Sequence, residues 1–85
     1  MINKIKEIAQ EIISTTNISC EIEKDETPDG SALYDLILNT ESKTIGFRFI
    51  KEQNNILCTT IDDNGPKYSS VQWQDIIETA KNYLN

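Results

Sequence analysis

The sequence contains no histidine, which removes the side chain most often used for proton transfer near neutral pH and a common metal ligand. Cysteine is scarce as well, because Cys20 and Cys58 are the only two, too few for a disulfide scaffold. Basic residues are also few: 8 Lys and Arg stand against 14 Asp and Glu, a net charge of −6. A protein that neutralises phosphates needs a basic face, so direct nucleic-acid binding is not expected.

Long apolar runs are missing too. No stretch approaches the roughly 20 apolar residues of a membrane-spanning helix, and no apolar signal segment follows Met1. We therefore expect no membrane association and a cytoplasmic location, where both thiols stay reduced. With three glycines and two prolines in all, there is no glycine-rich loop that cradles phosphate.

Hydrophobic periodicity divides the 85 residues into six elements. Apolar residues recur every three or four positions over 2–16, which predicts a helix. Alternation of apolar and polar residues then predicts strands. A turn-forming run that ends the last strand follows them: Asp62-Asp63-Asn64-Gly65-Pro66. Ser69 and Gln72 fit the capping box of a final helix with an apolar stripe from Trp73 to Leu84. The expected strands cover 18–24, 32–39, 44–51 and 56–61, and the final helix covers 70–84.

This order predicts a single α+β domain over residues 1–85, with two layers. Short connections favour an antiparallel meander in which the four strands lie in chain order. Both helices must bury an apolar stripe, and the simplest arrangement places them together on one face of the sheet. One helix on each face is the alternative that the pattern leaves open.

The turn at 40–43 sets a register between the second and third strands. It places Leu36 opposite Phe47 on an apolar face, which we take as the core face, and Asp35 opposite Arg48 on the other. The outer face should be polar if it meets only water. Instead it carries five aliphatic residues, which predict a contact surface for a partner or a second copy unless they are ordinary scattered aliphatics. These residues are Leu33, Ile37, Ile50, Leu57 and Ile61.

Acidic residues gather along the first strand and its loop, with a further pair after the fourth strand. Such a set often serves solubility alone. It also suits a surface that docks on a basic, nucleic-acid-binding groove of a larger protein, with complementary charge setting rate and specificity. The residues are Glu21, Glu23, Asp25, Glu26, Asp29, Asp62 and Asp63.

No nucleophile with its base, metal site or cofactor loop emerges, so we expect no enzyme activity and no cofactor. Fourteen Ile against one Val, with eight Asn, indicate an AT-rich genome. In size, charge and this composition the chain resembles small phage or mobile-element proteins that inhibit host nucleases, among them the anti-CRISPR proteins. This resemblance implies an inhibitor or adaptor that binds a basic protein surface. The alternative is a structural or regulatory homodimer assembled through the outer sheet face, without nucleic-acid mimicry.

Overall fold

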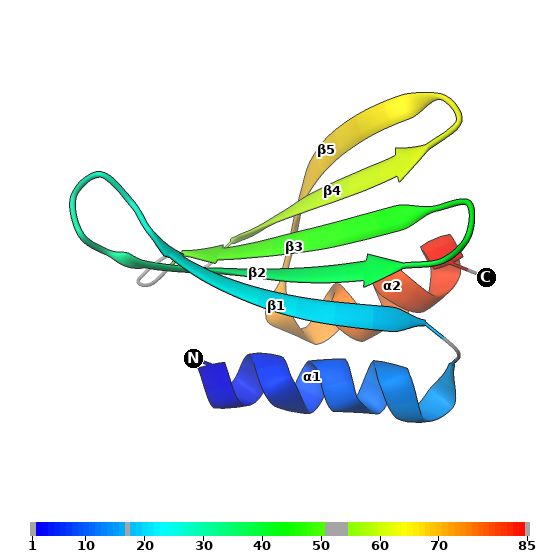
Figure 1. The fold of residues 1–85 in the computed structure, drawn as a ribbon, viewed down its shortest axis with the longest axis horizontal. Coiled ribbons are helices and arrows are strands. Elements are labelled where there is room, and N and C mark those ends of the chain that lie inside the picture. Colours follow the sequence, from blue (N-terminus) through cyan, green and yellow to red (C-terminus); the bar gives the residue numbers. More distant parts are fainter. Residues whose placement is uncertain (1, 17, 51–54, 85) are drawn as a thin grey trace.

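The computed structural model describes residues 2–16, 18–50 and 55–84, and shows an α+β fold (Figure 1). A helix opens the chain, five strands follow, and a short 3-10 turn leads into the last helix. The elements are α1 (Ile2–Thr15), β1 (Ser19–Glu26), β2 (Ala32–Asn39), β3 (Thr44–Ile50), β4 (Ile56–Asp62), β5 (Gly65–Val71), η1 (Trp73–Asp75) and α2 (Ile76–Leu84).

The five strands form one antiparallel sheet in the order β1-β2-β3-β4-β5, so each strand pairs with its neighbours in the chain. The predicted register of β2 and β3 is confirmed: Leu36 lies opposite Phe47, and Asp35 lies opposite Arg48. Arg48 donates two hydrogen bonds to Asp35, from Nε to Oδ1 at 2.9 Å and from an Nη to Oδ2 at 3.1 Å. A cross-strand pair of this kind contributes about 0.2–1 kcal/mol and supports this register over its one-residue slip.

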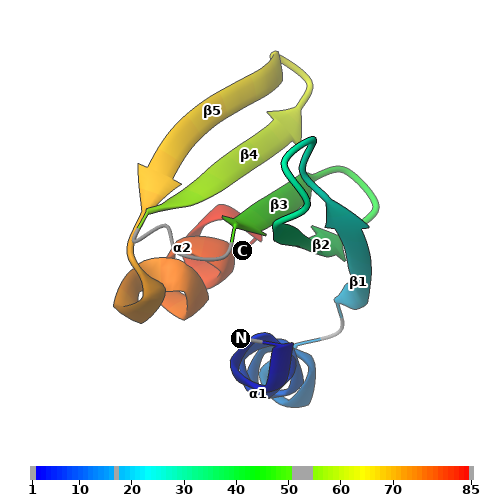
Figure 2. The ribbon, with the colours of Figure 1, turned by 90° about the vertical axis from the view of Figure 1, so that its left-hand side faces the viewer.

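Both helices pack on the same face of the sheet, and the alternative of one helix on each face is wrong (Figures 1 and 2). Their apolar stripes and the apolar side chains of β2, β3 and β4 form a single core, as the alternating pattern predicts. The opposite face of the sheet, called here the outer face, carries no helix of the described chain. The fully buried side chains of the core include Ile5, Ile12, Leu36, Leu38, Ile45, Phe47, Phe49, Ile56, Cys58 and Ile76.

The expectation of four strands is wrong, because residues 65–71 form a fifth. The run after β4 is a hairpin turn: Asp62 pairs with Gly65, and Asp62 Oδ1 accepts a 2.8 Å hydrogen bond from the backbone N–H of Asn64. Gly65 has a φ of +94°, a conformation that glycine adopts at little cost. Pro66 is tolerated at this place because β5 is an edge strand.

The predicted start of the last helix is also wrong. Ser69 and Ser70 belong to β5, where they lie opposite Cys58 and Leu57. The helical region begins with η1 after Gln72, and the Gln72 side chain makes no capping hydrogen bond. The capping-box pattern was therefore coincidental, since pairing with β4 satisfies this backbone before the helix begins.

Position 51, expected as the end of the third strand, and position 54, between the expected third and fourth strands, fall outside the described residues. Within the described ranges, no helix has the length and apolar character needed to span a bilayer.

Candidate functional site

The outer face is best described by rows of side chains that run across the strands. The strand registers place Glu21 of β1, Ile37 of β2, Gly46 of β3, Thr59 of β4 and Tyr68 of β5 in one row. This central row crosses the whole sheet, from its acidic edge at β1 to an aromatic ring at β5. The next row along the strands contains Glu23, Asp35, Arg48, Leu57 and Ser70.

Exposed apolar side chains concentrate on β4 and β5 of this face. Leu57 is 40% exposed, Ile61 44% and Tyr68 67%. Of the other predicted contact residues, Ile37 and Ile50 are half-buried. Leu33 is the exception: it lies between Asp25 and Ile50, is only 9% exposed, and offers little surface to a partner. We define the apolar patch as the exposed and half-buried members of this group: Ile37, Ile50, Leu57, Ile61 and Tyr68.

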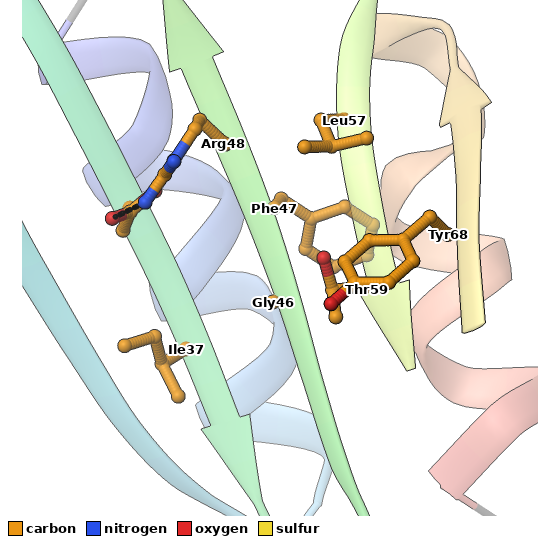
Figure 3. Close-up of a pocket in the computed structure, with 8 residues that line it drawn as sticks. Ile37, Gly46, Phe47, Arg48, Leu57, Thr59 and Tyr68 are labelled. Carbon is orange, nitrogen blue, oxygen red and sulfur yellow. Dashed lines mark hydrogen bonds and ion pairs between the residues drawn. The ribbon is translucent and has the colours of Figure 1, made fainter. Parts of the chain in front are cut away.

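Gly46 leaves a hollow in the middle of the patch, because β3 presents no side chain there. The hollow has a volume of about 340 Å³. Ile37 lies on one side of Gly46, and Thr59 and Tyr68 lie on the other (Figure 3). Its full lining is Asp35, Ile37, Gly46, Phe47, Arg48, Leu57, Thr59 and Tyr68.

The charged side of the hollow is already neutralised. Asp35 and Arg48 form an ion pair, and the hydrogen bond and charge of Asp35 raise the pKa of Arg48 above its usual value. The strand residues on the outer face that the structure describes include no other Lys or Arg. The uncompensated charge of this face is therefore negative, and β1 supplies it.

The acidic residues of β1 and the apolar patch share one surface. Glu21, Glu23 and Asp25 lie opposite Ile37, Asp35 and Leu33, all on the outer face. Their side chains are exposed and alternate with Cys20, Ile22 and Lys24, which turn to the core side. The sequence predicts the acidic residues and the aliphatic face as two sites; the β1–β2 register makes them neighbours. We call Glu21, Glu23 and Asp25 the acidic row.

The remaining predicted acidic residues lie elsewhere. Glu26 occupies the core-side position at the end of β1, and Asp29 is in the β1–β2 turn. Asp62 is the last residue of β4, and Asp63 begins the β4–β5 turn, which lies beyond Ile61. Because Ile61 pairs with Thr44 and thus aligns with the start of β1, this turn is at the other end of the sheet from Asp29. The seven residues therefore do not form one surface.

Asp29 has a structural partner set within its turn. Its Oδ1 accepts hydrogen bonds from the Thr27 hydroxyl and, at 3.1 Å, from the backbone N–H of Ser31. Gly30 completes the turn with a φ of +88°. Accepting these hydrogen bonds within the turn favours an ionised Asp29 carboxylate. It also leaves that carboxylate less available to a partner than the carboxylates of the acidic row.

The hydrogen bonds from Thr27 and Ser31 lower the pKa of the Asp29 carboxyl below its usual value of 3.8. Since the folded pKa is the lower one, the stabilisation is present above pH 3.8 and is lost as the pH falls through the folded value. We expect the Asp29 carboxyl carbon to titrate below the usual aspartate value of 3.8 in an NMR pH series, and Thr27→Val to raise its midpoint towards that value. An unchanged midpoint in Thr27→Val would contradict the role of this hydroxyl.

The cysteines are both free thiols: Cys58 is buried and Cys20 half-buried. Burial raises the pKa of each thiol, so the neutral form is favoured, unlike the lowered pKa of a reactive cysteine. In the described ranges, no three His, Cys, Asp or Glu side chains come close enough together to hold a metal ion.

Comparisons with protein-family models, curated proteins and solved structures found no match to this chain.

Proposed function

We propose that this protein is a protein-binding module, an inhibitor or adaptor that docks through its outer sheet face on a basic surface of a larger protein. The observation that carries the proposal is that the acidic row and the apolar patch share a sheet face on which no helix of the described residues lies. An apolar centre with a charged rim is the usual anatomy of a protein interface.

Charge indicates which partner fits this face. The acidic row repeats every second residue, so its carboxylates follow the strand at steps of about 7 Å. A partner that brings Lys or Arg to these positions gains complementary charge, which speeds association and rejects acidic competitors. The apolar patch then adds the water exclusion that exposed charges alone do not provide.

A second copy of the chain fits this face less well. Arg48 is the only cation among the described strand residues of the outer face, and it is paired with Asp35. Two copies packed face to face would therefore bring together surfaces that share a net negative charge. Light scattering after gel filtration, at low and high salt, measures the absolute mass and so distinguishes a separate partner from a second copy. We expect a monomer at both salt concentrations. A dimer formed through this face would replace the proposal.

The test of partner chemistry starts from a random dodecapeptide library selected on the immobilised protein. We expect the enriched peptides to carry net positive charge and to bind more weakly as salt rises. The double variant Glu21→Lys/Glu23→Lys should weaken these peptides by about tenfold or more, equivalent to about 1.4 kcal/mol. Affinity is lost because each reversal replaces a carboxylate that attracts the cationic peptide with an ammonium group that repels it.

The matched control reverses the same number of charges on α1. Glu7 and Glu11 are exposed on that helix, away from the outer face. Glu7→Lys/Glu11→Lys should leave peptide affinity nearly unchanged. An equal loss in both double variants would show a response to net charge alone, and neutral or acidic peptides among the best binders would contradict the proposal.

A further inference from the structure

Gly46 lies within the central strand, β3, where neither the backbone conformation nor the packing of this chain requires a glycine. Glycine in a strand interior is destabilising, because it orders a flexible backbone and packs no side chain. Its backbone does not need glycine, since the two positive φ values belong to Gly30 and Gly65. The pairing of Gly46 with Ile37 and with Thr59 continues the regular registers on both sides, so no bulge requires it.

Packing does not require glycine at this position either. A Cβ built on Gly46 would meet only the carbonyl oxygen of Leu36, at 4.0 Å, which is ordinary contact. A larger residue would enter the hollow and take up its space. The feature that glycine preserves is therefore the hollow itself, and a strand glycine of this kind commonly marks the close approach of another molecule.

The lining of the hollow indicates what approaches. Ile37 and Leu57 provide aliphatic walls, and Tyr68 adds a ring that is 67% exposed. Arg48 lies at one side with its side chain 49% exposed. Aromatic rings pair favourably with Tyr68 and with a guanidinium, and large aromatic residues are the commonest anchors of interfaces.

We propose that the Gly46 hollow is the socket for one aromatic side chain of the partner, with a cationic side chain of the same partner on the acidic row beside it. This deepens the proposed function and depends on it for the identity of the partner as a basic protein. Gly46 and Glu21 lie in the same row on β3 and β1, two strand spacings or about 10 Å apart. The partner therefore presents an aromatic group and a cation about 10 Å from each other.

The socket is tested without the partner, using N-acetyl-tryptophanamide as the probe. We expect titration of the labelled protein to shift the backbone amide signals of Ile37, Gly46 and Thr59. N-acetyl-alaninamide, which has the same backbone and no ring, should leave them in place. Shifts that are absent, or confined to residues outside the hollow, would overturn the proposal.

Gly46→Val places a branched side chain in the hollow, and Ser19→Val is its control on the outer face at the sheet corner. Gly46→Val should remove the shifts at Ile37 and Thr59 while raising the melting temperature, because valine suits a strand better than glycine. Ser19→Val should keep the shifts. If the valine at 46 distorts the sheet, Tyr68→Ala provides a second variant, since this exposed ring can be removed without touching the core and its loss should also weaken the probe.

The two proposals fail in different ways. Probe binding that persists in Gly46→Val refutes the socket, whereas selected peptides that ignore the Glu21→Lys/Glu23→Lys reversal refute the basic partner. If Gly46→Val leaves those peptides fully bound while the charge reversal weakens them, the docking face stands and the aromatic anchor does not.

Discussion

Phe47→Ala is expected to reduce the free energy of unfolding by about 3–5 kcal/mol, the usual cost of truncating a buried aromatic residue. Phe47 is 1% exposed, in the middle of β3, and it lies opposite Leu36 on one neighbouring strand and Cys58 on the other. The alanine variant loses this apolar contact and leaves a cavity at the centre of a thin core. The total free energy of unfolding of a small domain is about 5–15 kcal/mol, so the variant should be close to unfolding. Urea denaturation followed by circular dichroism measures the change.

Tyr68→Ala is the control for this measurement. It also truncates an aromatic residue in a strand, but Tyr68 is 67% exposed, and substitutions at such surfaces usually change stability by less than about 0.5 kcal/mol. Phe47→Leu provides a milder version if the alanine variant does not fold. Equal losses in Phe47→Ala and Tyr68→Ala would contradict the assignment of the core and outer faces.

The second large effect is expected in α1, where two adjacent isoleucines have opposite environments. Ile12 is fully buried against the sheet, whereas Ile13 is 42% exposed. Ile12→Asp places an unpaired charge in the core and should cost several kcal/mol, enough to release the helix. Ile13→Asp introduces the same residue and the same charge one position later, and should cost about 1 kcal/mol or less. Thermal unfolding of the two variants side by side measures the difference.

This comparison isolates burial, because helix propensity, net charge and distance from the helix end are nearly matched. Hydrogen exchange provides a second observable: Ile12→Asp should lose amide protection throughout α1, while Ile13→Asp keeps it. Similar melting temperatures for the two variants would mean that α1 is not docked through the Ile12 side of the helix.

The sequence predicted those parts of the fold in which buried faces set the pattern. The alternation in β2 and β3 is so strongly apolar on one side that a slip by one residue would expose Leu36 and Phe47, which fixes the register. The same argument placed Asp35 opposite Arg48. The stripes of both helices were equally clear, because each has one face that must be buried.

β5 was missed because it buries almost nothing. Its residues are exposed except for half-buried Gly65 and Val71 at its two ends, so no alternation of apolar and polar residues marks the strand. The signal that could have found it is the Asp-Asn-Gly run, which is as typical of a hairpin turn as of a stop. Backbone hydrogen bonding to β4 therefore makes residues 65–71 a strand, although their side chains show no strand pattern in the sequence.

The candidate site could likewise be predicted only where apolar alternation marks the strand. The aliphatic residues of the outer face were found by alternation, but Tyr68 was not, because it lies on the missed strand. Leu33 was assigned correctly to this face, yet between Asp25 and Ile50 it is only 9% exposed. Alternation also places Glu21 and Glu23 on the outer face, but the β2 residues opposite them are known only from the β1–β2 register, which the polar loop between those strands does not specify. The hollow over Gly46 could not be predicted, since a glycine in a sequence does not show whether space lies above it.

The neighbour-only order of the sheet has a consequence for how the chain folds. Every strand pairs with the one made just before it, so each hairpin can close while the next is still being synthesised, and loop closure never spans a large part of the chain. α1 is made before the sheet and α2, but the core it enters also contains Ile76 and Ala80 of α2. α1 therefore leaves the ribosome well before it can be fully buried, and its apolar stripe stays partly uncovered until residue 80 has emerged.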